Sequence, residues 1–591
     1  MIKKLLIANR GEIAIRIAEA AAELGIATVA VHSQDDANSL HIKRTDEVQA
    51  LKGRGAAAYL DIPGVIEAAK AAKCDAIHPG YGFLSENAEF ARACAKAKIR
   101  FVGPTPEQLA LFGDKAAARA QAIRCKVPVL PGTDGAVDAA GAVAFFRKNA
   151  KAGIALKAIA GGGGRGMRLI RKEDEIADAF ARASAEALSA FGNGALYAER
   201  LVSKARHIEI QIVGDGKGGV AALGERECTL QRRSQKIVEL APSPNLPEVL
   251  RKKIVVAAVT MAKSVSYRSL GTFEFLVEDK EFFFIEANPR LQVEHTVTEE
   301  VWGVDLVQAQ LQEVLPDIQG PRGAAIQLRV NMETMTADGS AKPGGGTLTV
   351  FEPPSGPGVR VDTYGYAGYR TNPNFDSLLA KVIVHGASFS AALARGERAL
   401  ASFRMEGAPS NLVFLRALLA DKDVRADRVH TRFVDEHAGR LIEAAGKLDA
   451  GRHFGAAAAS AAVPAGRQAG AKVDAVDPLA VLAFGKARTP EAAPVADDTP
   501  EGTVAVPAPM QGTVVSLSVK EGDAVAAGQP LLIMDAMKMQ HEIKSPARGY
   551  VRRIPVETGE TIYEGHALLF VEEADVEVKG AAVEEIGRAH V

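Results

Sequence analysis

Two acidic residues are expected to face each other in a hairpin near the middle of the chain. The segment Thr272–Leu276 carries Glu274 among apolar residues, a turn follows at residues 278–280, and a second apolar run continues to Glu286 and Asn288. Antiparallel strands joined by so short a turn bring the two carboxylates within reach of each other. Carboxylate and amide oxygens are hard ligands suited to a Mg²⁺ ion that bridges nucleotide phosphates. For either glutamate alone, a solvated position on a strand is the alternative.

A glycine run at residues 161–164 is the second feature that could do chemistry. It lies between two β-like segments, with Lys157 before it and Arg165 after it. Successive glycines let backbone N–H groups fold over phosphates, and the two cations add positive charge. The spacing is not the Gly-x-x-x-x-Gly-Lys-Ser/Thr of a P-loop, and a flexible linker is the alternative reading. With the carboxylate pair, the loop predicts an ATP site under a mobile phosphate lid.

The third feature is an internal repeat that surrounds a lysine near the end of the chain. Seven positions recur after 37 residues: Pro509, Gly512, Val519, Gly522, Gly528, Leu531 and Leu532 return as Pro546, Gly549, Val556, Gly559, Gly565, Leu568 and Leu569. Each copy alternates apolar residues with turn glycines, so two copies can bury a shared face as a flattened β-sandwich. The joining segment 534–545 must turn back on itself. We therefore expect Lys538 near a hairpin tip, between Met537 and Met539; an ordinary exposed lysine is the alternative.

The elements that must position these groups indicate a multidomain α/β protein. The chain has 591 residues, of which 47% are hydrophobic, enough for three to five domains. Residues 3–8 form an apolar run, a helical period follows from Ile13 to Leu24, and residues 28–31 are again apolar, which predicts strand, helix and strand. Gly11 alone is not a dinucleotide-binding fingerprint. We predict a doubly wound unit up to about residue 113.

Charge and cysteine content argue against several functional classes. A net charge of −1 and a pI near 6.9 give no electrostatic footprint for nucleic acid. The four cysteines have no Cys-x-x-Cys spacing and fit free thiols in a reducing compartment. The apolar run before Asn9 is too short for a signal sequence or a membrane span. We expect a cytoplasmic protein that binds neither nucleic acid nor membrane.

The stretch Asp535-Ala536-Met537-Lys538-Met539 within the two-fold repeat resembles the attachment site of the biotin carboxyl carrier family. The resemblance covers about 70 residues and implies biotin on Lys538, attached by a biotin protein ligase. A lipoyl domain shares the architecture, but lipoylation accompanies Asp-Lys-Ala, whereas the two methionines favour biotin. Asp535 departs from the family's usual Glu.

The first 445 residues resemble the ATP-grasp superfamily and, within it, biotin carboxylase. The motifs occur in family order: Gly113-Asp114-Lys115, the glycine lid, Gln231 to Lys236, the run from Glu286 to His295, and Gly356-Pro357-Gly358-Val359-Arg360. The resemblance implies an α/β multidomain protein with a small all-β flattened-barrel biotinyl domain. Its expected parts are a pre-ATP-grasp domain at 1–113, an ATP-grasp domain at 114–320 with its lid at about 129–201, a C-terminal α+β domain at 321–446, a linker at 447–503, the biotinyl domain at 504–573 and an unordered tail at 574–591.

The roles that the resemblance implies can be assigned residue by residue. ATP-binding positions are Lys115, Lys157, Gly162, Gly163, Gly164, Glu199, His207, Gln231 and Ser234, and the ligands of Mg²⁺ or Mn²⁺ are Glu274, Glu286 and Asn288. Arg290, Gln292 and the Val293 amide match the bicarbonate clamp, Glu294 the base, Lys236 a residue near the transferred phosphate, and Arg360 the group that stabilises the biotin enolate. These roles suit a reaction in which bicarbonate is deprotonated, phosphorylated to carboxyphosphate, and broken down beside biotin.

Three departures from the family pattern concern the same region. Ser234 stands where relatives have His or Asn, the segment Arg329–Thr334 replaces a commoner Asn-Ala-Glu-Asp ending, and Ala160 replaces the first of five glycines. None of them is expected to touch the proposed chemistry directly. Cys228 is expected to be a buried bystander thiol.

The linker and the end of the chain bear on the partner that accepts the carboxyl group. The linker of about 57 flexible residues at 447–503 would span roughly 40 Å, which is enough to carry the biotinyl domain between two sites. It is too short for the extra domain that propionyl-type α-subunits have at this place. Residues 585–591 read like a translated sequencing adapter, so we expect the natural protein to continue. The carboxyltransferase is then either fused or a separate β-subunit, within a homo-oligomeric complex, and acyl-CoA of fatty acid metabolism is favoured over pyruvate or urea as acceptor. An ATP-grasp carboxylate–amine ligase and a carrier with a decayed ATPase remain alternatives.

Overall fold

The computed structural model describes residues 2–133, 135–159, 167–191, 193–202, 204–336, 339–448, 500, 502–536 and 539–574. The chain forms two compact units, residues 1–450 and 451–591. Three predicted features lie outside the described residues: the glycine loop with Ala160, nearly all of the linker at 447–503, and Lys538. The same holds for the tail after residue 574. No helix in the described part of the chain is long and apolar enough to cross a membrane.

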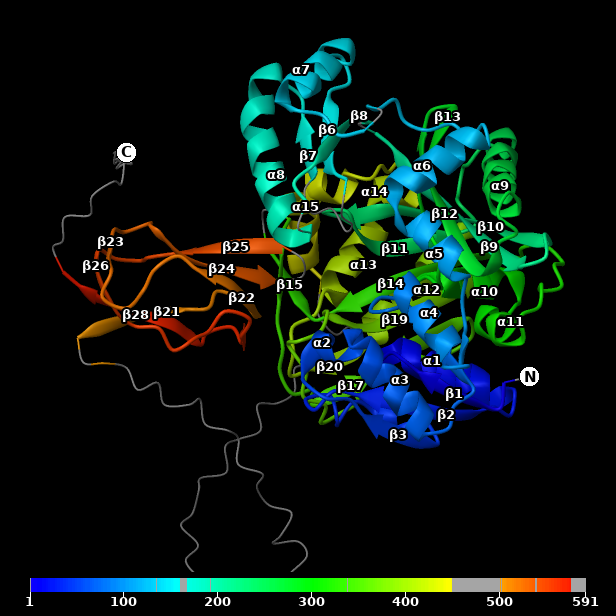
Figure 1. Ribbon diagram of the computed structural model, residues 1–591, viewed down its shortest axis with the longest axis horizontal. Coiled ribbons are helices and arrows are strands. Elements are labelled where there is room, and N and C mark those ends of the chain that lie inside the picture. Colours follow the sequence, from blue (N-terminus) through cyan, green and yellow to red (C-terminus); the bar gives the residue numbers. More distant parts are fainter. Residues whose placement is uncertain are drawn as a thin grey trace, which may run out of the picture. The chain divides into compact units, whose positions relative to one another are not determined.

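The N-terminal part of the first unit is the predicted doubly wound layer (Figure 1). Its parallel sheet has the order β3-β2-β1-β4-β5. The strands are β1 (Lys4–Ile7), β2 (Ala27–His32), β3 (Glu47–Ala50), β4 (Ala76–His78) and β5 (Arg100–Phe101). The helices are α1 (Gly11–Glu23), α2 (Gly55–Leu60), α3 (Ile62–Ala71), α4 (Ala88–Lys96) and α5 (Pro106–Gly113), with a 3₁₀ turn at Leu40–Lys43. Asn87 caps α4, accepting a hydrogen bond from the Phe90 amide.

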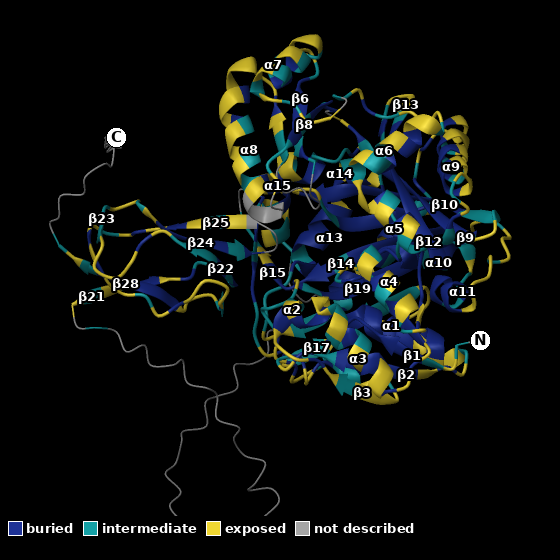
Figure 2. Cartoon of the chain, viewed as in Figure 1, coloured by how far each residue is buried: buried dark blue, intermediate teal, exposed yellow. Residues whose placement is uncertain are grey.

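An antiparallel eight-stranded sheet forms the centre of the first unit, in the order β13-β12-β9-β10-β11-β14-β19-β18. Its strands are β9 (Arg206–Asp215), β10 (Val220–Arg232), β11 (Gln235–Ala241), β12 (Arg268–Glu278), β13 (Glu281–Asn288), β14 (Ala324–Asn331), β18 (Val359–Thr363) and β19 (Leu378–Gly386). Because β11 pairs with β14, the sheet runs without a break across the expected boundary at residue 320. In Figure 2 most of this sheet is dark blue, which marks buried residues, and the outer faces of the surrounding helices are yellow, which marks exposed residues.

Helices cover the central sheet and close its cores. They are α6 (Lys115–Arg124), α9 (Glu248–Lys263), α10 (His295–Trp302), α11 (Leu306–Gln312), α12 (Phe389–Ser402), α13 (Leu412–Ala420), α14 (Lys422–Arg425) and α15 (Phe433–Gly446). Two short ladders complete this part: β15 (Glu333–Met335) with β16 (Ala341–Pro343), and β17 (Val350–Glu352) with β20 (Arg404–Glu406). On β9, Ile208, Ile210 and Ile212 pack against α9 in one core cluster. The alternate residues of β9 are therefore free to face the opposite side.

The lid is a separate small layer within the first unit. Its sheet has the order β7-β6-β8, with β6 (Ile154–Ala158), β7 (Met167–Ile170) and β8 (Leu196–Arg200). The helices α7 (Ala139–Lys148) and α8 (Ile176–Phe191) cover it, with a 3₁₀ turn at Glu173–Glu175. The predicted β-segments on both sides of the glycine loop are thus confirmed as β6 and β7.

The second unit confirms the repeat as a sandwich of two four-stranded sheets, β21-β28-β26-β23 and β25-β24-β22-β27. The strands are β21 (Thr503–Pro507), β22 (Gly512–Leu517), β23 (Ala524–Val525), β24 (Pro530–Ala536), β25 (Met539–Lys544), β26 (Gly549–Arg553), β27 (Thr561–Ile562) and β28 (Ala567–Glu573). The repeated residues are equivalent in the fold: Leu531 and Leu568 are both fully buried, and Gly522 and Gly559 have φ angles of +91° and +90°. The hairpin is confirmed as well, because β24 and β25 pair up to Ala536 and Met539, which leaves residues 537–538 as its connection.

Candidate functional site

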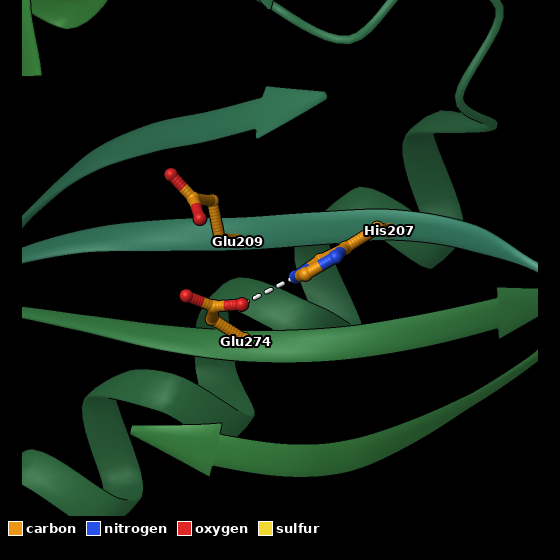
Figure 3. A group of neighbouring side chains, drawn as sticks. All are labelled: His207, Glu209 and Glu274. Atoms are coloured by element: carbon orange, nitrogen blue, oxygen red, sulfur yellow. Dashed lines mark hydrogen bonds and ion pairs between the residues drawn. The ribbon is translucent and has the colours of Figure 1, made fainter. Parts of the chain in front are cut away.

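A row of buried polar side chains lies on the face of the central sheet opposite α9. His207 and Glu209 alternate with the isoleucines of β9, and Glu274 on β12 pairs in register with Glu209. Figure 3 shows the three side chains together, with a hydrogen bond between His207 and Glu274. Their ligand atoms all lie within 4.8 Å of one another. Carboxylates gathered this closely need cations, because like charges in a buried site raise each other's energy.

Lys236 on β11 supplies one of those cations and joins three carboxylates. Its Nζ lies 2.6 Å from Glu209, 3.3 Å from Glu274 and 2.7 Å from Glu294. Burial alone would lower the pKa of this ammonium, but the surrounding acidic groups outweigh it and raise the pKa well above its ordinary value. Lys236 is therefore a fixed positive charge at the centre of the site.

Arg226 supplies the second cation and ties the neighbouring elements together. Its guanidinium, on β10, is fully buried and forms an ion pair with Glu209. It also donates to Gln211 at 2.7 Å, and to Thr272 and Thr298 at 2.9 Å each. One side chain thus connects β9, β10, β12 and α10, which holds the carboxylate row at fixed separations.

Glu294, the predicted base, precedes α10 and is only 1% exposed. It accepts hydrogen bonds from Lys236 at 2.7 Å and from Arg329 at 3.1 Å. Burial would raise the pKa of the Glu294 carboxyl, but Lys236, Arg329 and Arg226 together lower it well below its ordinary value. The carboxylate is consequently ionised near neutral pH and able to accept a proton.

The predicted clamp lies directly before this base. Arg290 donates to Gln292 at 2.6 Å and to Asn288 at 3.1 Å, and its Nε lies 3.4 Å from Glu86. Gln292 in turn donates to Glu274 at 3.0 Å. The structure therefore brings Arg290 and Gln292 of the predicted clamp into one hydrogen-bonded set with Glu274 and Asn288 of the predicted metal ligands.

The predicted metal ligands occupy the hairpin as expected, with Glu274 opposite Glu286 in the β12–β13 register. Asn288 donates to Glu274 at 2.5 Å, while Glu286 lies 3.2 Å from Lys115. Burial would raise the pKa of Glu274, but Lys236 and His207 outweigh it and lower the pKa, so this ligand is ionised. The ionised carboxylate of Glu274, the partly exposed carboxylate of Glu286 and the amide oxygen of Asn288 lie on adjacent strands. These three oxygen donors fit Mg²⁺.

The predicted nucleotide residues fall into two groups. In the lid, Lys157 on β6 lies 2.5 Å from Glu199 on β8, and Lys157 is about a quarter exposed, so its ammonium can reach a phosphate. At the central sheet, Gln231 contacts His207 at 2.7 Å. Ser234 lies in the β10–β11 turn with a φ of +64°. Gly162, Gly163 and Gly164 lie outside the described residues.

Arg360 on β18 lies in a second charged cluster at the other end of α10. Its guanidinium donates to Asp362 at 2.7 and 2.9 Å and to Glu299 at 2.8 Å. Burial would lower the pKa of Arg360, but Asp362 and Glu299 raise it far above the ordinary value. Arg16 holds Glu299 from α1 at 2.9 Å. Arg360 is thus a rigidly placed cation, as an enolate-stabilising role requires.

One expectation about the departures is wrong. The segment Arg329–Thr334 was expected to leave the chemistry untouched, yet Arg329 contacts Glu294 directly and forms an ion pair with Glu239. The reason is the sheet order: β14 lies beside β11, so its polar side chains reach the same face as Lys236. Cys228 is buried, with its Sγ 3.9 Å from Glu294, and burial raises the pKa of this thiol well above its ordinary value.

Sequence reasoning did not identify Glu209, Arg226, Glu239, Arg329 and Lys381 as members of the site. The sequence does carry a signal for Glu209. Polar residues alternate with isoleucines along β9, and all of the strand except its two end residues is buried, so the polar side chains must face other buried polar groups. Each of the other four has at least one partner on an element far away in the sequence, such as Thr298 for Arg226 and Val293 for Lys381, and no local spacing indicates these contacts.

Comparisons with known proteins match both units. The model described as "Biotin carboxylase, N-terminal domain" matches residues 1–109, "Carbamoyl-phosphate synthase L chain, ATP binding domain" 114–314, "Biotin carboxylase C-terminal domain" 327–436 and "Biotin-requiring enzyme" 504–571. Human mitochondrial pyruvate carboxylase is 46% identical over 452 residues, or 74% of this chain. The chain spans 38% of that relative's length.

Two further relatives match nearly the whole chain. The biotin-dependent acyl-coenzyme A carboxylase alpha3 subunit of Mycobacterium leprae is 39% identical over 601 residues, which cover 96% of this chain and 98% of the relative. The solved structure of a single-chain, multi-domain long-chain acyl-CoA carboxylase is 39% identical with a TM-score of 0.66, and the match covers 98% of this chain and 51% of that one.

Proposed function

Because the chain belongs to the biotin-dependent carboxylases and joins a biotin carboxylase to a biotinyl domain, we propose that it carboxylates biotin on Lys538 with ATP and bicarbonate and serves an acyl-CoA carboxylase. The observation that carries the proposal is the arrangement around α10. A buried, ionised Glu294 lies beside the Arg290–Gln292 pair at its start, and the fixed cation Arg360 contacts Glu299 within the same helix.

In the first half-reaction, Arg290 and Gln292 orient bicarbonate, and Glu294 accepts its proton. The deprotonated oxygen then attacks the γ-phosphorus of ATP, and the bond to the β-phosphate oxygen breaks, which gives carboxyphosphate and ADP. Lys236 neutralises charge near the transferred phosphoryl group, and Lys115 and Lys157 hold the phosphates. Glu274, Glu286 and Asn288 would hold Mg²⁺, which supplies charge neutralisation for phosphoryl transfer.

In the second half-reaction, carboxyphosphate splits into CO₂ and phosphate; the phosphate would take the ureido N1′ proton, and N1′ would then bond to the CO₂ carbon, so that biotin would supply the nitrogen that accepts the carboxyl group. Arg360 stabilises the negative charge that develops on the ureido oxygen, because its guanidinium is already fixed by Asp362 and Glu299. Lys538 would hold the biotin. The described strands β24 and β25 pair as far as Ala536 and Met539, the residues that bracket Met537 and Lys538 in the sequence.

The arrangement of the chain favours an acyl-CoA as final acceptor. Two relatives that match both the carboxylase unit and the biotinyl unit are acyl-CoA carboxylases, whereas the match to human pyruvate carboxylase covers 452 residues. The carboxyltransferase is then a fused domain or a separate subunit. Sequencing the gene past codon 584 separates these: an immediate stop codon contradicts the fused arrangement, and a long open frame supports it.

Three measurements test the function. The chain should cleave ATP in a bicarbonate-dependent manner that free biotin stimulates; a carboxylate–amine ligase would need an amine instead, and a carrier with a decayed ATPase would cleave none. After co-expression with a biotin protein ligase, the wild-type chain should bind labelled avidin and Lys538→Arg should not. Retained avidin binding by Lys538→Arg would show that Lys538 is not the attachment site. Fixation of labelled bicarbonate by the complete complex onto acyl-CoA rather than pyruvate or urea would identify the acceptor.

A further inference from the structure

Lys381 on β19 is a completely buried lysine that sequence reasoning passed over. Its Nζ lies 2.9 Å from Glu12 and 3.6 Å from Asp362, and it donates a hydrogen bond of 3.2 Å to the Val293 carbonyl. Removing an ammonium from water is costly even when it is paired, and apolar residues often replace buried ion pairs without loss of stability. Because stability alone does not require a lysine at this position, we looked for a second role in its contacts.

The hydrogen bond to Val293 reaches the predicted base. The Val293 carbonyl belongs to the same planar peptide unit as the amide of Glu294, so fixing the carbonyl direction also fixes the backbone from which the Glu294 side chain departs. Glu294 is the residue immediately before α10. Lys381 thus helps determine where that helix begins and where its first carboxylate lies.

The second contact reaches Arg360. In the β18–β19 ladder, Asp362 pairs directly with Lys381, and Asp362 receives both arms of the Arg360 guanidinium. Burial opposes ionisation of Asp362, but Lys381 and Arg360 lower its pKa below the ordinary value. The Asp362 carboxylate is therefore shared between two cations. Arg16 shares Glu299 with Arg360 in the same way.

Sharing these carboxylates has an electrostatic consequence for Arg360. A carboxylate whose charge is divided between two cations neutralises each of them less than an exclusive partner would. Arg360 therefore keeps a fixed geometry while retaining positive potential for an anion placed next to it.

We propose that Lys381 is a positioning residue for both half-reactions, because one ammonium orients the peptide that carries the base Glu294 and shares the Asp362 counter-ion of Arg360. The proposal rests on the function proposed above and extends it to a residue that touches no substrate. Glu12, its nearest carboxylate partner, belongs to α1, so the ammonium also connects the N-terminal layer to the two catalytic groups.

The experiment compares Lys381→Met with the wild-type full chain. We expect bicarbonate-dependent ATP cleavage to fall by ~10–100-fold, the usual effect of losing a group that orients a catalytic residue, and the amount of free biotin carboxylated per ATP cleaved to fall as well. The loss should appear in kcat for biotin carboxylation, with KM for ATP unchanged, because Lys381 contacts no predicted nucleotide residue. The wild-type chain must first show bicarbonate-dependent ATP cleavage stimulated by biotin; failure there refutes the proposed function and not the role of Lys381.

A double variant separates positioning from plain stability. Lys381→Met leaves Glu12 buried without its cation, whereas Lys381→Met with Glu12→Gln removes both charges. If Lys381 serves only to balance Glu12, the double variant recovers both thermal stability and biotin carboxylation, which would overturn the proposal. If Lys381 positions Asp362 and the Val293 peptide, stability recovers and carboxylation does not. Where the single variant does not fold, the double variant carries the test alone.

Arg10→Met is the matched control. Arg10 is likewise buried and paired with a buried carboxylate, Asp36, at 2.7 and 2.9 Å, and it also contacts Tyr364, Phe375 and Tyr369, none of which has a predicted catalytic role. Its substitution should lower the Tm while leaving the ratio of biotin carboxylated to ATP cleaved unchanged. A Lys381→Met variant that behaves like Arg10→Met in both measurements would refute a positioning role.

Discussion

Substituting Arg360 should separate the two half-reactions. Arg360→Ala removes the cation that stabilises the charge developing on biotin, but it leaves Glu294, Lys236 and the Arg290–Gln292 pair in place. We expect bicarbonate-dependent ATP cleavage to survive and biotin carboxylation to fall by ~10²-fold or more, which corresponds to about 2.7 kcal/mol of lost transition-state stabilisation.

The cost of this substitution to folding can be judged from the partners of Arg360. Removing one member of a buried pair typically costs ~3–5 kcal/mol, because an uncompensated charge stays behind. Here Asp362 keeps Lys381 at 3.6 Å and Glu299 keeps Arg16 at 2.9 Å, so neither carboxylate loses its last cation. The Arg360 side chain is also 26% exposed, which admits water to the gap. We therefore expect a loss of stability below that range and a folded variant.

The assay measures ADP release with bicarbonate and, in parallel, transfer of labelled bicarbonate to free biotin. Arg360→Lys is the control, because it keeps the charge and loses the two-armed geometry; its carboxylation should lie between those of the wild type and Arg360→Ala. Equal loss of both activities in a folded Arg360→Ala would refute the separation, since it would place Arg360 in the first half-reaction.

Three further predictions follow from the buried groups. Glu294→Gln should abolish both ATP cleavage and carboxylation, because bicarbonate then keeps its proton; cleavage at the wild-type rate would contradict its role as base. Burial, and then the charge of Glu227, raise the pKa of Asp427 to about 7, so its protonation stabilises the fold at low pH and this stability is lost as the pH rises through 7. Relative to Asp427→Asn, the wild-type free energy of unfolding should fall by up to ~4 kcal/mol between pH 4 and 8, measured by urea unfolding, and a parallel pH dependence would contradict this. Leu568→Ala should destabilise the biotinyl unit by ~2–5 kcal/mol, seen as a lower calorimetric transition with bicarbonate-dependent ATP cleavage unchanged; a loss of that cleavage would contradict the independence of the two units.

The sequence predicts those elements whose signals are local. The repeat of 37 residues specified two equivalent halves, and the structure has equivalent strands at the same offset, such as β22 and β26. The hairpin around residues 278–280 likewise follows from a short turn between two apolar runs, and Glu274 pairs with Glu286 as expected. Periodicity and turn residues act over a few positions, which is why they can be read from one chain.

The network around Glu294 could not be predicted in the same way. Its cations come from β11 and β14, 58 and 35 positions away in the sequence, and the sheet order that brings those strands together has no local signal. A strand pattern indicates which face a side chain occupies, but not which other side chain meets it there. The mistaken expectation for Arg329 has this cause.

The pairing of charges in this structure explains how one site can hold so many of them. Each cation assigned to an anionic substrate already has a carboxylate partner: Lys115 has Glu286, Lys157 has Glu199, and Lys236 has three glutamates. The same glutamates, Glu274 and Glu286, are the proposed ligands of a divalent cation. A metal ion bound to them would take over part of their charge and leave the Lys115 ammonium available to a phosphate, while Lys236 stays held by Glu209 and Glu294. Such a change adds little uncompensated charge to a buried region, and Glu294 stays ionised because both Lys236 and Arg329 keep their contacts with it.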